Sequence, residues 1–505
     1  MKQNRREFLI KSASALSMAA LAAQTERFGV VSALAQTKKG KPENARLAPP
    51  GDYKALVCIS LDGGNDGNNM VVPKHADANV SGYAQYAAAR AAKGLAIARA
   101  ELLSINVPRL NNLEYGFHPN FGDMTANGLN RGVHELFAQQ KLAVVANVGT
   151  LVEPMTRRQY IDNSVPKPYQ LGSHFDQQAQ MYSARADVRF QIGWGGRIAD
   201  YRQALDNAGA LIPMISSING STLFTLGGAT RALTLADAAT PLNRIFVLNG
   251  FENNDPATVA RRRIFDRLRT RDLTSELIKS ASHVTDQAVT AGQAFGSQQE
   301  VTVNFPNTEI GRQLKQVARI IRKRSEVNVR RQIFFVHFGG FDTHNGQVAG
   351  QTDGQNGLFF HLSQAMRAFY DELTVQAVES SVTAFTLSEF GRTFDPADSG
   401  INVGSDHAWG NHMLVMGGAV RGGDFYGSTR PDGSGDIFPT LVKNGPDDAD
   451  NAGSAARGRW IPTVSVEQYA ATLTRWFGVP DNEINAIFPN LSNFALSDLG
   501  FMNNS

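Results

Sequence analysis

The segment that decides the expected fold is Ala55-Leu56-Val57-Cys58-Ile59-Ser60-Leu61, which passes directly into Asp62-Gly63-Gly64-Asn65-Asp66. A short apolar run that stops at a turn rich in glycine and carboxylates is typical of a buried strand followed by a loop. Three other apolar runs border similar loops: residues 332–338 before 339–344, 382–387 before 388–392, and 413–418 after 404–412. We expect all four strands to belong to one sheet.

Helical segments separate these strands. Residues 310–321 repeat apolar side chains at the spacing of one helix face, and they precede the strand at 332. Residues 358–373 do the same before the strand at 382. Alternation of helix and strand indicates parallel pairing with helices packed on the sheet. The predicted fold class is therefore α/β, with a mostly parallel sheet flanked by helices.

Ligand-type side chains gather where these strands meet their loops. In an open α/β sheet the carboxyl ends of parallel strands share one edge, and ligands bind there. The residues expected at this edge are Asp62, Asp342, His344, Glu389, His407 and His412. Carboxylates and imidazoles without a thiolate set suit zinc, manganese or magnesium, so we predict a divalent-metal site. For residues 404–412 alone, a capped turn and a hydrogen-bonded strand histidine account for the pattern equally well.

The composition of the chain limits its size class and its partners. A length of 505 residues allows one large domain, which we place at 51–503 with insertions at about 205–300 and 430–459. The formal charge of +3 comes entirely from residues 1–35, so the overall charge indicates neither a nucleic-acid partner nor a membrane-surface partner. Arg261-Arg262-Arg263 lies in a helical segment and is interpreted as a solvated helix face in preference to an anion site.

The amino terminus has the pattern of a twin-arginine export signal. Asn4-Arg5-Arg6-Glu7-Phe8-Leu9 precedes a weakly apolar run, and Ala33-Leu34-Ala35 offers small residues for cleavage. We therefore predict a signal peptide at 1–35 that engages the twin-arginine machinery, a flexible linker at 36–50, and a periplasmic or secreted protein. We expect no stable membrane span, because no later segment holds the roughly 18 consecutive apolar residues that a span needs.

Several motifs together resemble a known family. They are the twin-arginine start, Leu61-Asp62-Gly63-Gly64-Asn65-Asp66, Ser173-His174-Phe175-Asp176, Phe341-Asp342-Thr343-His344, Ser388-Glu389-Phe390-Gly391-Arg392-Thr393, Asp406-His407-Ala408-Trp409-Gly410 and Met416-Gly417-Gly418-Ala419-Val420. The combination resembles the exported bacterial proteins catalogued as domain of unknown function 1501, over roughly residues 50–503. That family is similar to the alkaline phosphatase and sulfatase superfamily of α/β enzymes, so the resemblance implies an alkaline-phosphatase-like fold.

The resemblance also implies roles for individual residues. Asp62 resembles the metal carboxylate after the first strand, Asp342 and His344 a metal-binding pair, Glu389 the next carboxylate and His407 the late histidine ligand. Ser173 stands where a nucleophile would stand, at the start of a helix whose amino end favours an anion. His174 would be a general acid or an orienting residue. Arg392 or Arg157 would clamp the oxygens of the anion, unless each forms an ordinary surface ion pair.

Two departures from the superfamily pattern concern the metals. The pair is spaced Asp342-Thr343-His344, where Asp-x-x-x-His is usual, and Phe390 follows Glu389 where a histidine is usual. Phenylalanine binds no metal, so a complete two-metal site is not expected unless His412 or Asp406 compensates.

The expected function is an exported, metal-dependent hydrolase of small-molecule phosphate esters. Sulfate esters are less favoured, because sulfatases of the superfamily use a Cys/Ser-x-Pro-x-Arg motif. Here the only cysteine, Cys58, lies in a strand, and Ser164-Val165-Pro166-Lys167-Pro168 lacks the arginine. The alternative is a non-catalytic exported protein that keeps the fold for ligand binding or assembly at the cell envelope.

The export assignment predicts that replacing both Arg5 and Arg6 with lysine traps the protein in the cytoplasm. Cell fractionation and immunoblotting of the wild type and the double variant measure this. Normal periplasmic accumulation of the variant would contradict the assignment.

Overall fold

A computed structural model describes residues 52–503, apart from 78–79, 123–130, 219, 243–252, 270–281, 283–285, 287–288, 297–299, 349–353, 398, 400–401 and 452–455. The predicted signal peptide and linker lie outside the described residues. No helix among those that the structure describes has the length and apolar character needed to cross a bilayer.

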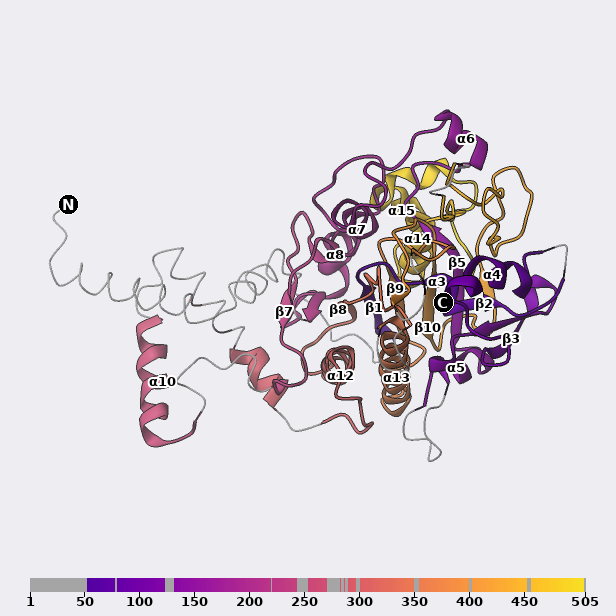
Figure 1. Cartoon of the computed structure of the whole chain (residues 1–505). Helices are drawn as coiled ribbons and strands as arrows, with labels where there is room; N and C mark the ends of the chain where they lie inside the picture. The colour runs from indigo at the N-terminus through magenta and orange to yellow at the C-terminus, as the bar shows by residue number, and fades with distance from the viewer. Residues whose placement is uncertain are drawn as a thin grey trace.

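The architecture is a mixed, mostly parallel sheet covered by helices on both faces (Figure 1). Its strands are β1 (Lys54–Leu61), β5 (Leu142–Gly149), β6 (Ile215–Ile218), β7 (Leu233–Leu235), β8 (Arg331–Phe338), β9 (Val382–Leu387), β10 (Asn411–Gly417), β11 (Phe425–Tyr426) and β12 (Val464–Ser465). Within the described residues eight of these nine strands follow the order β11-β5-β10-β9-β1-β8-β6-β7, and the ninth, β12, pairs with β5 off this path. The α/β class predicted from the sequence is confirmed.

Strand β1 lies at the centre and shows why the sheet is buried on both sides. It pairs in parallel with β8 on one side and β9 on the other. Alternate side chains of β1 enter different cores: Val57 and Ile59 join the core that contains α12 (Glu309–Arg322) and α13 (Gly354–Val375). Leu56 and Cys58 join the opposite core. A strand buried on both faces needs a continuous apolar run, as the sequence has here.

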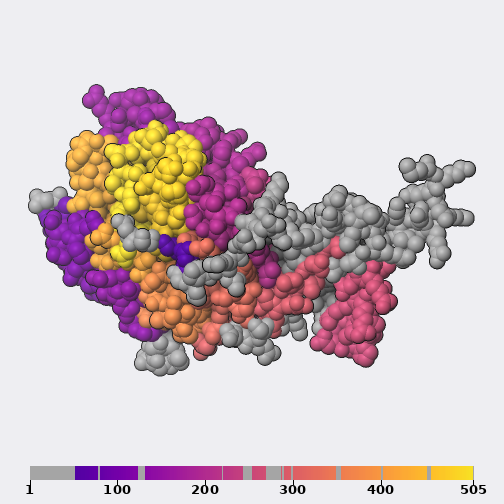
Figure 2. Space-filling model, turned by 180° about the vertical axis from the view of Figure 1, so that it is seen from behind, coloured from indigo at the N-terminus to yellow at the C-terminus, as the bar shows by residue number. Residues whose placement is uncertain are grey.

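The opposite face of the sheet is covered by α8 (Trp194–Asp206), α14 (Val466–Phe477) and α15 (Asp481–Ile487). Figure 2, seen from behind, shows the yellow carboxyl-terminal segment beside the magenta segment near residue 200. Other α-helices among the described residues are α3 (Gly67–Met70), α4 (Tyr83–Arg90), α5 (His134–Ala138), α6 (Arg157–Asp162), α7 (His174–Ser183) and α10 (Pro256–Arg269). A separate antiparallel sheet has the order β2 (Val71–Pro73), β4 (Leu113–Phe117) and β3 (Leu103–Val107).

The strand β10 differs from the expected arrangement. It pairs antiparallel with both β9 and β5. Residues 404–410, which precede β10, therefore lie at the same sheet edge as the loops that follow β1, β8 and β9. The four loops do share one edge, but the fourth reaches it from the beginning of its strand.

The loop after β1 is anchored by a buried ion pair. Asp66 and Arg90 form a salt bridge with both side chains fully buried, and Gln347 donates a second hydrogen bond to Asp66. Removing one member of such a pair leaves an uncompensated buried charge.

We therefore predict that Arg90→Leu lowers the free energy of unfolding by about 3–5 kcal/mol, measured by urea denaturation. The matched control is Arg158→Leu, whose side chain is 92% exposed and pairs with Asp162 at 3.5 Å. We expect that control to lose no more than about 1 kcal/mol. Equal losses in the two variants would contradict the anchoring role of the buried pair.

Candidate metal centre

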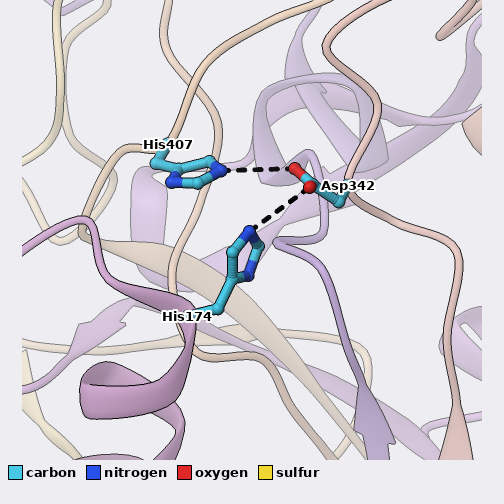
Figure 3. A group of neighbouring side chains, drawn as sticks. All are labelled: His174, Asp342 and His407. Atoms are coloured by element: carbon cyan, nitrogen blue, oxygen red, sulfur yellow. Dashed lines mark hydrogen bonds and ion pairs between the residues drawn. The ribbon is translucent and has the colours of Figure 1, made fainter.

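Three imidazoles from different segments surround the carboxylate of Asp342. Asp342 and His344 lie in the loop after β8, His407 lies just before β10, and His174 is the first residue of α7. Figure 3 shows His174 and His407 turned toward the two oxygens of Asp342. The loop after β1 passes very close to the backbone of Asp342. A Cβ added to Gly63, whose φ is +116°, would lie 2.3 Å from the Asp342 backbone nitrogen. Glycine is thus required directly after Asp62.

His174 is held from both ends of its ring. Helix α7 begins here because the Ser173 hydroxyl accepts a hydrogen bond from the Asp176 backbone N–H, as an N-cap does. The His174 Nδ1 lies 2.9 Å from Glu389 Oε1, and its Nε2 lies 3.4 Å from Asp342 Oδ2. The hydrogen bond to Glu389 is the main reason that the pKa of His174 is raised.

The surroundings of His407 favour its neutral form, whereas those of His174 favour the protonated form. Its Nδ1 donates to the Gly172 carbonyl at 2.7 Å, which fixes the proton of the neutral ring on Nδ1. Its Nε2 lies 3.2 Å from Asp342 Oδ1, and its ring stacks on Phe390 with centroids 4.6 Å apart. Burial is the main cause that lowers the pKa of His407.

His344 completes the group from the loop of Asp342 itself. Its Nδ1 lies 3.0 Å from Asp406 Oδ1, and Arg457 holds the other oxygen of Asp406 at 2.9 Å. Its Nε2 lies 3.1 Å from Asp342 Oδ1 and 3.0 Å from His407 Nε2. Asp406 therefore orients a histidine, which is a different role from that of a direct ligand.

The three rings share a pattern that fits a metal ion. Each Nδ1 is occupied by an oxygen acceptor, so in the neutral rings each Nε2 lone pair is turned toward a carboxylate. Lone pairs and a carboxylate repel one another unless a proton or a metal ion lies between them, and metal-binding histidines are usually oriented in this way. The ligand atoms of His174, Asp342 and His407 all lie within 4.8 Å of one another. The nitrogen and oxygen donors suit zinc or manganese.

Asp342 is kept ionised by its neighbours. Burial alone would raise its pKa, but the hydrogen bond from Arg392 and the nearby histidines outweigh that effect and lower the pKa. The Arg392 Nη2 lies 2.6 Å from Asp342 Oδ1. An ionised carboxylate at the centre of three imidazoles is the form that binds a cation.

Arg392 does not occupy the position expected of a substrate clamp. Its side chain is completely buried, and it donates to the backbone carbonyls of Gly63, Gly64, Phe341 and Ser405 as well as to Asp342. These bonds join three loops at the sheet edge. We infer that Arg392 positions Asp342, because its donors are already used within the protein.

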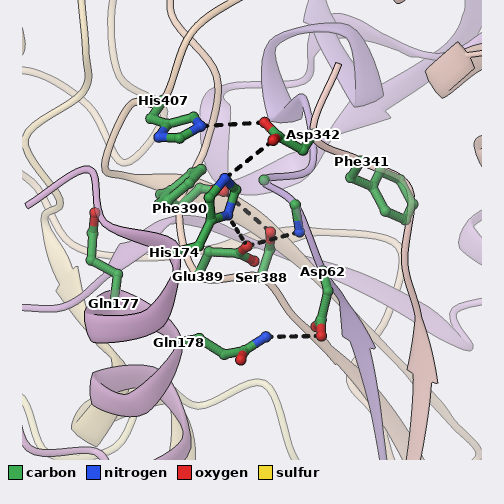
Figure 4. A network of polar contacts seen from close by, with 12 residues as sticks. Asp62, His174, Gln177, Gln178, Phe341, Asp342, Ser388, Glu389, Phe390 and His407 are labelled. Atoms are coloured by element: carbon green, nitrogen blue, oxygen red, sulfur yellow. Dashed lines mark hydrogen bonds and ion pairs between the residues drawn. The ribbon is translucent and has the colours of Figure 1, made fainter. Parts of the chain in front are cut away.

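Glu389 contacts the nitrogen of His174 that faces away from Asp342 (Figure 4). Its Oε1 accepts from the Gly63 N–H at 2.8 Å and from His174, so this oxygen orients a histidine. The side chain is only 2% exposed. Phe390 fills the space beside it with an apolar wall against His174 and His407.

Asp62 belongs to a neighbouring polar cluster. Its Oδ2 lies 2.8 Å from His337 Nε2, and it also accepts from Gln178 on α7 (Figure 4) and from Tyr182. The hydrogen bond to Asp62 is the main cause that raises the pKa of His337. The structure brings Asp62 to the predicted edge, but it pairs Asp62 with His337 instead of with the three imidazoles.

His412 is not brought to the centre. It lies inside β10, fully buried between Phe438 and Trp460, and its Nδ1 accepts from the Asn147 backbone N–H. Burial lowers its pKa to about 3. His412 is thus a packed strand histidine, the alternative that the sequence also allowed.

The sequence did not predict two groups that orient side chains at this sheet edge: His337, which pairs with Asp62, and the Gly172 carbonyl, which accepts from His407. His337 was hidden in an apolar strand, although a histidine next to the last residue of a strand that ends at this edge was a usable signal. The Gly172 carbonyl carries no side-chain signal, so only the fold reveals it.

Comparisons with known proteins agree with the motifs. A profile described as "Protein of unknown function (DUF1501)" matches residues 53–465, which is most of the chain. The chain belongs to this family. A search of curated proteins finds no match.

Two solved structures share a remote likeness with this chain. PsFucS1 sulfatase from Pseudoalteromonas sp. is 9% identical with a TM-score of 0.32, covering 98% of this chain and 77% of its own. Ps i-CgsB in complex with k-i-k-neocarrahexaose is 9% identical with a TM-score of 0.31, covering 87% of this chain and 77% of its own. A likeness this remote says nothing about the substrate of this DUF1501 protein.

The two shifted histidines predict distinct titrations in metal-free protein. We expect His174 to titrate above, and His407 below, the ordinary histidine pKa of about 6.5 in NMR spectra. The pKa of His174 is higher in the folded protein than in the unfolded chain, where it is about 6.5. Its contact with Glu389 therefore stabilises the fold fully at pH values below the unfolded pKa. This stabilisation is lost as the pH rises through the folded pKa.

The control for this prediction is Glu389→Gln, which keeps the shape and removes the charge. It should lower the pKa of His174, because the hydrogen bond to Glu389 is the main cause of the raised value. An unchanged His174 titration in this variant would contradict the assignment.

Proposed function

We propose that this protein is an exported hydrolase of phosphate esters that depends on a divalent metal. The observation that carries the proposal is that the Nε2 atoms of three imidazoles all face one ionised carboxylate, that of Asp342. We propose His174, Asp342 and His407 as ligands, with His344 as the adjacent fourth donor. Export rests on the twin-arginine pattern of the sequence.

The chemistry needs a metal and residues that prepare the site. A divalent ion bound here would polarise an ester oxygen and acidify a coordinated water. Glu389, Asp406 and the Gly172 carbonyl fix the ring orientations beforehand, so little reorganisation is needed during reaction. Arg392 keeps Asp342 ionised. Phe390 excludes water from one side of His174 and His407.

Ser173 is the proposed nucleophile. It lies between Gly172 and His174, both of which take part in the centre, and it caps the amino end of α7, where the helix dipole favours an anion. Its Oγ donates to Asp176 Oδ2 at 2.8 Å, so a proton acceptor is already in contact. Attack on phosphorus would move that proton to Asp176, form a bond from the serine oxygen to phosphorus and break the ester P–O bond. The leaving oxygen would depart as the alcohol after taking up a proton.

Phosphate is favoured over sulfate for a chemical reason. A serine sulfate is not readily hydrolysed at sulfur, whereas a serine phosphate is released by water activated at a metal. The sequence has no Cys/Ser-x-Pro-x-Arg motif that would supply a formylglycine.

The test measures metal content and turnover in the same preparations. Metal-loaded protein should hydrolyse aryl phosphates faster than aryl sulfates, and Asp342→Asn should lose both the metal and the turnover. Asp162→Asn removes a carboxylate that is 55% exposed on α6, so it serves as the matched control. Stoichiometric metal without turnover of phosphate mono- or diesters would favour the non-catalytic binding protein. Faster cleavage of sulfates would reject the proposed ranking.

A separate variant examines the nucleophile. Ser173→Ala should abolish turnover while metal binding persists, and loss of the N-cap should cost about 1 kcal/mol of stability. Turnover that survives this variant would show that water attacks directly and that Ser173 only caps α7.

A further inference from the structure

Helix α10 (Pro256–Arg269) is a strongly basic element away from the candidate centre. Figure 1 shows it standing apart from the sheet and its covering helices, and Figure 2 shows its rose-coloured atoms on the outside of the molecule. Its sequence, PATVARRRIFDRLR, contains five arginines and one aspartate. Nothing in the proposed hydrolase chemistry uses it.

One face of α10 is apolar and exposed. Ala257, Ala260, Ile264 and Leu268 recur at the three- and four-residue spacing of one helix face. Ile264 is 57% exposed and Leu268 is 39% exposed. A solvated basic face accounts for the arginines but gives no reason for this stripe of apolar side chains.

The arginines border this stripe. By helical spacing, Arg263 and Arg267 lie along one edge and Arg261 lies along the other. A hollow of about 380 Å³ is lined by Pro256, Val259, Ala260, Arg263, Ile264 and Arg267. Two guanidinium groups therefore border an apolar floor, an arrangement that accepts a molecule with an anionic head and an apolar body.

We propose that α10 binds the surface of an anionic phospholipid membrane. Its apolar stripe enters the headgroup boundary, and its arginines contact lipid phosphates. Helices that lie in this interface combine an apolar face with a basic one, and each basic residue near an anionic surface adds to the attraction. The charge of α10 selects lipid phosphates over a second copy of this chain, because two such helices would repel each other. Such binding needs no membrane-spanning helix, and it would hold an exported protein at an anionic membrane face.

The experiment is co-sedimentation of the purified full chain with vesicles of phosphatidylcholine alone or with phosphatidylglycerol added. We expect binding only to the anionic vesicles, weakened by salt. Arg263→Gln should weaken binding roughly fivefold, the effect of removing one basic residue near the surface. Ile264→Glu should abolish it, because a charge replaces the central apolar side chain.

Two matched controls use exposed residues on other helices. Arg158→Gln changes a side chain that is 92% exposed on α6, and Leu205→Glu changes a residue that is 60% exposed on α8. Both should bind like the wild type. The proposal would be overturned by absent binding, by equal binding to neutral vesicles, or by equal losses in the controls. A dimer that Ile264→Glu dissociates, without vesicle binding, would also overturn it and assign the face to a second copy.

Discussion

The arrangement of this sheet edge depends on the carboxylate of Asp342. It receives the Arg392 guanidinium on the buried side and faces the Nε2 atoms of three histidines on the open side. Arg392 also binds carbonyls in the loops after β1 and β8 and in the segment before β10. The buried Arg392 guanidinium therefore holds the loops together and also keeps the Asp342 carboxylate ionised. The loops of the site are thus joined to one another beneath it.

The fold brings these groups together through strand direction. Loops that follow β1, β8 and β9 reach one edge because those strands are parallel, and the segment before β10 reaches it because β10 is antiparallel. Helix α7 supplies His174 from outside the sheet. Residues at positions 174, 342 and 407 can thus converge although they are far apart in the chain.

The strands and their shared edge could be predicted from the sequence, because apolar runs that end in glycine and carboxylates are typical of strands entering loops. The direction of β10 could not, since an apolar run has the same pattern in either direction. Separating His407 from His412 depends on packing against Phe438 and Trp460, which are distant in sequence. The orienting role of Glu389 was also beyond reach, because only the structure shows which oxygen faces His174.

The central claim is that Asp342 and its histidines form a metal centre. Anomalous X-ray diffraction from crystals of the exported protein, collected at the absorption edge of the metal found by elemental analysis, tests it most directly. We predict an anomalous peak within about 2.0–2.2 Å of an Asp342 oxygen and the Nε2 atoms of His174 and His407. A metal peak at Asp62 and His337 with none at Asp342, or no peak from protein that hydrolyses phosphate esters, would contradict it.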